Sequence, residues 1–106
     1  MKLAIIISTK EAEIVWNALR LANFAVKEGD DVTVFLIGPG VDYEEGNNAT
    51  FTIRDQTTQF LQNKGKMQAC GTCVKMRQKE ETATCPISSM SELYGLIKTS
   101  DKIITF

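Results

Sequence analysis

Two cysteines separated by two residues, Cys70 and Cys73, are the side chains of this sequence best placed for chemistry. They lie in residues 67–77, a stretch that indicates the end of a buried strand, a tight turn at Gly71 and the start of a helix. Glycine lets the backbone turn sharply and lets a second sulfur atom or a substrate approach closely. The free N–H groups and the positive dipole end of the helix that follows favour a thiolate over a thiol. Since a thiolate is the species that attacks sulfur, Cys70 is a candidate nucleophile or sulfur carrier.

Two cations in the same stretch, Lys75 and Arg77, would add positive charge near the thiol if they bend toward it. Judged by spacing alone, Cys70 could equally be a small buried side chain that ends a strand. The third cysteine, Cys85, stands outside any motif, so we interpret it as an incidental loop residue unless the fold brings it beside Cys70. The predicted catalytic residue is therefore Cys70, and the accessory candidates are Gly71, Cys73, Lys75, Arg77 and Cys85.

The Cys-x-x-Cys spacing itself is shared by thioredoxin-like redox pairs and by half of a zinc site. Thioredoxin-like domains place the pair after an early strand, whereas this pair comes late in the chain. A structural zinc site needs about four Cys or His ligands, and this chain has three cysteines and no histidine. We predict no metal and no cofactor, although a zinc site completed by a carboxylate or by a second subunit stays open. The lack of histidine also excludes Ser-His-Asp and Cys-His catalysis from a site built by this chain alone.

Length and composition indicate one domain spanning residues 1–106. The formal net charge is -1 with no basic block, which argues against binding to nucleic acid. The apolar run at residues 3–7 is too short for a signal-peptide core, and no stretch approaches the about 20 apolar residues of a membrane span. An odd number of cysteines favours reduced thiols. We therefore expect a cytoplasmic protein that contacts neither nucleic acid nor membrane.

Strand and helix patterns alternate along the chain, which predicts βαβ units and a mostly parallel sheet covered on both faces. A polar, acidic segment at residues 41–50 is expected to be a solvated connector over the carboxyl ends of the strands. Residues 80–85 read as a loop or a short edge strand stopped by Pro86. Capping-box spacing occurs at Thr52 and Asp55, and again at Ser89 and Glu92, before two of the helices. The predicted strands are 2–7, 31–37, 66–70 and 101–106, and the predicted helices are 11–28, 52–64, about 73–79 and one that begins after Ser89.

The first predicted helix has an unusually wide apolar face, covering about half of its circumference. Trp16 and Phe24 lie outside even that arc, among charged and polar neighbours. They are either singly exposed aromatics, which are common on protein surfaces, or part of a contact between subunits, where aromatics are enriched.

Four stretches, taken in order, resemble the DsrE/DsrF family of small intracellular sulfur-metabolism proteins. Residues 3–8 resemble the family's first strand and turn. Met67-Gln-Ala-Cys70-Gly71-Thr72-Cys73 resembles the strand that ends in the family's cysteine. Residues 89–97 and 101–106 resemble its last helix and its closing strand. The likeness spans nearly the whole chain.

The resemblance implies a three-layer α/β/α sandwich with a parallel five-stranded sheet in the order 4-3-2-1-5, in which residues 82–85 supply a short edge strand. In sulfur-relay members of the family, a cysteine matching Cys70 receives sulfur as a persulfide and passes it to a partner protein. Members form dimers, trimers or hexamers, so we expect a homo-oligomer, most simply a trimer or a hexamer. Sulfur donor and acceptor proteins are the expected partners.

Three functions stay open at this level. The first is sulfur transfer with Cys70 as the sulfur-accepting thiolate. The second is a thiol–disulfide switch that joins Cys70 to Cys73 or to Cys85, since strands 3 and 4 would lie about 4.8 Å apart. The third is a non-enzymatic oligomeric binding protein in which the cysteines have no chemical role.

Overall fold

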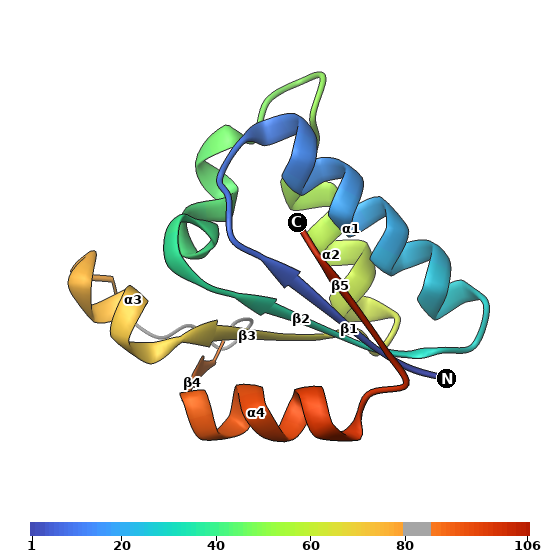
Figure 1. The fold of residues 1–106 in the computed structure, drawn as a ribbon. Coiled ribbons are helices and arrows are strands. Elements are labelled where there is room, and N and C mark those ends of the chain that lie inside the picture. The colour runs from blue at the N-terminus through green and yellow to red at the C-terminus, as the bar shows by residue number, and fades with distance from the viewer. Residues whose placement is uncertain (80–85) are drawn as a thin grey trace.

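The computed structural model describes residues 1–79 and 86–106 and contains a five-stranded parallel sheet. The strand order is β4-β3-β2-β1-β5, which confirms the predicted order (Figure 1). The strands are β1 (Lys2–Ile7), β2 (Asp31–Leu36), β3 (Lys66–Cys70), β4 (Ile87–Ser88) and β5 (Lys102–Thr105). The helices are α1 (Ala12–Lys27), the 3-10 helix η1 (Gly38–Gly46), α2 (Ile53–Gln62), α3 (Gly71–Met76) and α4 (Met90–Thr99).

The sheet is the middle of three layers. Helices α1 and α2 cover one face, α4 covers the other, and α3 extends beyond the carboxyl end of β3 (Figure 1). The larger apolar cluster, which includes Ile5, Leu19 and Phe60, lies on the α1 and α2 side. The second cluster lies under α4 and consists of Ala4, Phe35, Cys70, Leu93 and Leu96. Because burying a leucine side chain contributes about 1.5–3 kcal/mol, the two leucines of α4 anchor this helix against the sheet.

Helix α1 needs its wide apolar face because it packs on two elements, the sheet and α2. Trp16 is half-buried. Its ring centroid lies 5.5 Å from the ring centroid of Phe51. The guanidinium carbon of Arg20 lies over the Trp16 ring, 4.4 Å from its centroid. Phe24 is different, because 62% of it is exposed. Ile14 and Leu21 of the same helix are also exposed. Contacts within the chain therefore account for Trp16 but leave Phe24 uncovered.

The acidic segment at residues 41–50 is only partly the solvated connector that we expected, since Glu44, Glu45 and residues 48–50 are exposed. Its first half belongs to η1, where Val41 and Tyr43 are buried. A Cβ atom on Gly40 would collide with the carbonyl oxygen of Ile7, so only glycine lets η1 lie this close to the end of β1. The predicted position of this segment, over the carboxyl ends of the strands, is correct.

The edge strand β4 lies later in the sequence than predicted. It consists of Ile87 and Ser88, which pair with Ala69 and Cys70 of β3, so it follows Pro86 instead of preceding it. Proline has no N–H to donate, but its carbonyl accepts the N–H of Ala69 at 3.1 Å, so it can stand at the entrance to an edge strand. The predicted strand at 82–85, including Cys85, lies outside the described residues.

The two predicted capping boxes differ in outcome. Ser89 caps α4, because its hydroxyl oxygen accepts the N–H of Glu92 at 3.2 Å. Thr52 precedes α2 but its side chain makes no capping hydrogen bond. In the described part of the chain, no helix combines the length and the apolar content that crossing a lipid bilayer would require.

Candidate functional site

Cys70 stands where β3 ends and α3 begins, at the carboxyl edge of the sheet. Helix α3 starts at Gly71, two residues earlier than the sequence pattern indicates, so Cys70 is its N-cap residue. Its side chain belongs to the apolar cluster beneath α4, and only 3% of the residue is exposed. Cys73, one helical turn later, is partly exposed and packs against both apolar clusters. The fold thus places a buried thiol and a more accessible thiol side by side.

Gly71 is required by a close approach of two elements. A Cβ atom at this position would lie 2.8 Å from Cγ2 of Ile87 and 2.9 Å from the carbonyl oxygen of Ser88. The predicted need for a close approach is therefore correct, but the approaching element is β4. This contact fixes the turn that separates Cys70 from Cys73.

The environment of Cys70 favours its thiolate. Burial acts to raise the pKa of Cys70, but the backbone N–H and the thiol of Cys73, together with the backbone N–H of Thr72, outweigh it and hold the pKa below its ordinary value. The N–H groups act electrostatically, since the side chain of Cys70 makes no capping hydrogen bond. The depressed pKa increases the fraction of Cys70 that is ionised, and hence nucleophilic, near neutral pH.

The environment of Cys73 has the opposite effect. Burial and the adjacent Cys70 thiol raise the pKa of Cys73 above its ordinary value, although a hydrogen bond from the backbone N–H of Gly38 and the charge of Arg77 partly oppose this. The Gly38 nitrogen lies 3.2 Å from Sγ of Cys73. When the pair loses one proton, the thiolate is therefore favoured at Cys70 and the thiol remains at Cys73.

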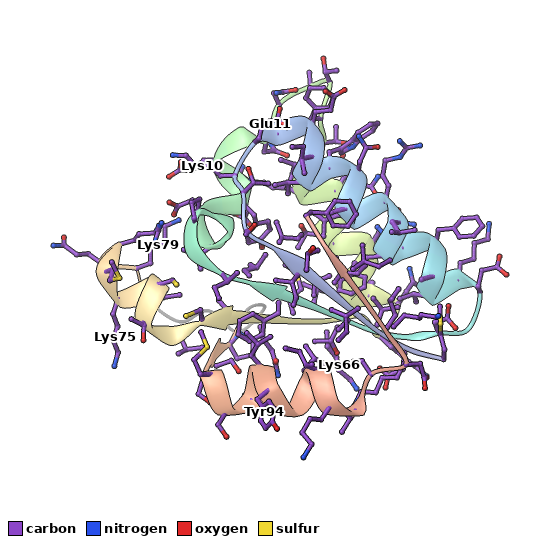
Figure 2. The ribbon with its side chains drawn as sticks, viewed as in Figure 1. Lys10, Glu11, Lys66, Lys75, Lys79 and Tyr94 are labelled. Atoms are coloured by element: carbon purple, nitrogen blue, oxygen red, sulfur yellow. The ribbon has the colours of Figure 1, made fainter. Side chains whose placement is uncertain are left out.

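The two predicted cations, Lys75 and Arg77, lie differently from one another. Figure 2 shows Lys75 extending from the outer side of α3, and this residue is exposed. Arg77 turns toward η1, where its Nε atom lies 3.3 Å from Oδ2 of Asp42. Its Nη1 atom also donates to the carbonyl oxygen of Cys73 at 3.3 Å. The charge of Arg77 therefore acts on Cys73, not on the Cys70 thiol.

Asp42, which the sequence analysis did not identify, forms ion pairs that join η1 to the segment at the end of α3. Besides Arg77, it contacts Lys79, whose Nζ atom lies 2.5 Å from Oδ1 (Lys79 is labelled in Figure 2). Burial alone would raise the pKa of Asp42, but Lys79, Arg77 and Lys10 hold it below its ordinary value. The signal in the sequence was an acidic segment, 42–45, that could face the basic run at 75–79. Nothing local to either segment indicated that the two meet.

Ser88 is a second neighbour that the sequence did not indicate. It is buried and pairs with Cys70 in the sheet register. Its hydroxyl donates to a carboxylate oxygen of Glu92 at 2.5 Å. This pair joins β4 to the first turn of α4, beside the apolar cluster that contains Cys70. Within residues 1–79 and 86–106, no group of three or more Cys, Asp or Glu side chains is arranged to hold a metal ion; the predicted accessory residue Cys85 lies outside these ranges.

Comparisons with solved structures show a shared fold. The ychN protein from E. coli superimposes with a TM-score of 0.84 at 20% sequence identity, covering 100% of both chains. A conserved protein of unknown function from Bacteroides thetaiotaomicron superimposes with a TM-score of 0.79 at 20% identity, covering 99% of this chain and 94% of the other.

Sequence relatives and a family model extend this likeness. An uncharacterised protein of Methanopyrus kandleri is 30% identical over 100 residues, which is 89% of this chain and 83% of that protein. An uncharacterised protein of Methanocaldococcus jannaschii is 29% identical over an alignment that covers 100% of both chains. The model of the DsrE/DsrF-like family matches residues 1–106. Because that match extends over the whole chain, the protein belongs to the DsrE/DsrF-like family.

Proposed function

We propose that this protein is a sulfur carrier in which Cys70 accepts sulfur as a persulfide and passes it to a partner. In the loading step, the Cys70 thiolate attacks the outer sulfur of a donor persulfide. A new S–S bond forms at Cys70, the S–S bond of the donor breaks, and the donor leaves as a thiolate. The step transfers one neutral sulfur atom, so it needs no separate oxidant or reductant.

The observation that supports this proposal most strongly is the depressed pKa of Cys70 at the carboxyl edge of the sheet. Burial opposes ionisation there, yet the N–H groups of Cys73 and Thr72 and the Cys73 thiol more than compensate. An apolar site also suits a persulfide, because water and oxidants reach its sulfur atoms less readily. The chemistry requires reduced thiols, so we place this carrier in the cytoplasm.

The test is a loading experiment. The protein is incubated with a cysteine desulfurase and cysteine, or with thiosulfate, and mass spectrometry measures the addition of one sulfur atom. Peptide mapping should locate the added sulfur on Cys70, and Cys70→Ser should not be loaded there. Cys85→Ser removes a thiol elsewhere in the sequence and serves as the matched control for cysteine loss. Loading of Cys70→Ser at the wild-type level would refute the assignment.

A second candidate is a thiol–disulfide switch formed by Cys70 and Cys73. The observation in its favour is that Cys73 stands one helical turn after Cys70 and packs against the apolar cluster that contains it. If the switch is the only function, the protein will cycle between dithiol and disulfide in redox buffers and will not accept sulfur from any persulfide donor.

We also propose that the carrier works as a homo-oligomer, a trimer or a hexamer. The support is the exposed apolar surface that remains on two helices. On α1 it consists of Ile14, Leu21 and Phe24, and on α4 of Met90, Tyr94 and Ile97. Covering such side chains in a subunit contact would remove apolar surface from water. Donor and acceptor proteins would then approach the carboxyl edge of the sheet, where Cys73 is partly exposed.

A further inference from the structure

When Cys70 carries a persulfide, the position of Cys73 determines which of the two persulfide sulfur atoms Cys73 can reach. Cys73 stands one helical turn after Cys70 and packs against the apolar cluster that contains Cys70, and the Cys73 thiol acts on the Cys70 sulfur itself, since it lowers the pKa of Cys70. In a persulfide this atom becomes the inner sulfur, bonded both to the protein and to the transferred sulfur. Cys73 is therefore positioned to attack the inner sulfur, and the outer sulfur is the group that this attack would displace.

We propose that Cys73 is a resolving thiol, which discharges the Cys70 persulfide by releasing its outer sulfur as sulfide. This inference rests on the carrier function proposed above and adds an exit for the sulfur that needs no acceptor protein. It gives Cys73 a chemical role of its own, distinct from its influence on the Cys70 thiolate.

Atoms and electrons balance in the discharge step without any reactant from outside the chain. The Cys73 thiolate attacks the inner sulfur, a Cys70–Cys73 disulfide forms, and the bond to the outer sulfur breaks. The outer sulfur takes the electron pair and leaves as hydrosulfide, so it is reduced while the Cys73 sulfur is oxidised, and the Cys70 sulfur stays at the disulfide level. With the protons included, one persulfide and one thiol give one disulfide and one hydrogen sulfide. A dithiol reductant, such as a thioredoxin-type protein, then restores the two thiols for another cycle.

The disulfide that this step requires needs the two residues to come closer than regular helical spacing. Residues three apart on a helix have Cβ atoms about 5–6 Å apart, whereas a disulfide joins Cβ atoms about 3.5–4.5 Å apart. Cys70 is the N-cap residue, with ψ at 119°, so its backbone lies outside the regular helix. The adjustment would therefore fall at the junction of β3 and α3.

Gly38 is the residue that prepares Cys73 for attack. Its backbone N–H reaches Sγ of Cys73 from η1, a separate element, at 3.2 Å. A hydrogen bond to sulfur stabilises the thiolate that forms when Cys73 loses its proton. Burial and the Cys70 thiol nevertheless keep the pKa of Cys73 above its ordinary value. Discharge should therefore be slow near neutral pH and faster as the pH rises, which leaves time for a partner to collect the sulfur first.

The experiment follows loaded protein after the donor is removed. All variants contain Cys85→Ser, so that no thiol other than the pair can respond. Each is loaded with inorganic polysulfide and desalted, and a sulfide-selective electrode and mass spectrometry follow it over time. The parent with both thiols should release one sulfide per loaded chain while the loaded species decays to a form two hydrogen atoms lighter than the reduced protein. Cys73→Ser and Cys73→Ala should keep the sulfur on Cys70 and release sulfide at least about tenfold more slowly, because the attack within the chain is lost.

The outcomes separate the two proposals. If Cys73→Ser and Cys73→Ala take up no sulfur on Cys70, the carrier function is wrong and the discharge step is wrong with it. If Cys70 is loaded but sulfide is released equally fast with and without Cys73, the carrier function stands and Cys73 is not a resolving thiol. Loaded parent that persists without forming the disulfide would overturn the inference in the same way. Using two substitutions at position 73 guards against a folding defect peculiar to one of them.

Discussion

Oδ2 of Asp42 lies 3.3 Å from Nε of Arg77, and this ion pair joins η1 to the residue that ends α3. Together with the contact to Lys79, it ties two segments that are more than thirty residues apart in the sequence. Helix α3 has only six residues and extends beyond the sheet, so few contacts hold it. The orientation of Cys73 therefore depends on a carboxylate that itself has no part in sulfur chemistry.

Replacing this carboxylate should loosen the site and lower stability. We expect Asp42→Asn to reduce the free energy of unfolding by about 1–2 kcal/mol at neutral pH, between the values typical of exposed and of buried ion pairs. The folded-state pKa of Asp42 is lowered, so its stabilising contribution is complete above the ordinary carboxyl pKa and disappears as the pH falls through the lower, folded-state value. Urea unfolding of both proteins over a pH series measures this. A difference that stayed constant down to the most acidic pH would contradict the ionic explanation.

The low pKa of Cys70 can be measured directly. Since Cys70 is buried, thiolate absorbance in the ultraviolet is a better measurement than alkylation. We expect one thiol to ionise below the ordinary cysteine pKa of about 8.5, and this ionisation should be missing in Cys70→Ser. Cys73→Ala should move this ionisation to higher pH, because the variant lacks the Cys73 thiol, which lowers the pKa of Cys70.

The same pKa predicts how stability depends on pH. Because the pKa of Cys70 is lowered in the folded state, its ionisation stabilises the fold fully above the pKa of the unfolded chain. That contribution is lost as the pH falls through the lower, folded-state pKa. The free energy of unfolding of the wild type relative to Cys70→Ser should therefore rise with pH across this interval. A relative stability that fell with pH would show that the pKa of Cys70 is raised in the folded state.

Gly71→Ala tests the close approach of β4. The added methyl group would lie 2.8 Å from Cγ2 of Ile87 and 2.9 Å from the carbonyl oxygen of Ser88, and overpacking of this kind costs about 1–3 kcal/mol. Gly95→Ala, in the middle of α4, is the matched control, because nothing lies within 4 Å of its added Cβ atom. Alanine there should stabilise the helix by about 0.5–1 kcal/mol. Thermal unfolding of the two variants should therefore shift in opposite directions, and equal shifts would contradict the steric argument.

The exposed aromatic of α1 tests assembly. We expect the wild-type protein to sediment as a homo-oligomer and Phe24→Asp to shift it toward the 11.8 kDa monomer, because a charge would replace an apolar contact. Gln62→Glu, an acidic substitution at an exposed position of α2, is the control and should leave the distribution unchanged. A wild-type protein that is already monomeric at micromolar concentration would refute the oligomer.

Local patterns determined much of this protein. The apolar run at 2–7 predicted β1 to the residue, because a buried parallel strand is continuously apolar. The strand predicted at 66–70, between Gly65 and Gly71, matches β3 to the residue. The same reasoning put Cys70 at the carboxyl edge of the sheet, beside a glycine and a helix start. The capping pair Ser89 and Glu92 marked the beginning of α4 correctly for a similar reason, since a cap is a contact between near neighbours in sequence.

Only the tertiary structure decided what depends on contacts between distant segments. Strand β4 has two residues, too few for any periodicity, and is defined by its pairing with Ala69 and Cys70. The N–H of Gly38 reaches Cys73 across 35 residues of sequence, and Asp42 meets Arg77 across a similar separation. The opposite pKa shifts of the two thiols follow from such contacts and from burial, which no pattern of residue types displays. The sequence by itself thus determined which thiol stands at the sheet edge, and the fold decided how the second thiol is held against it.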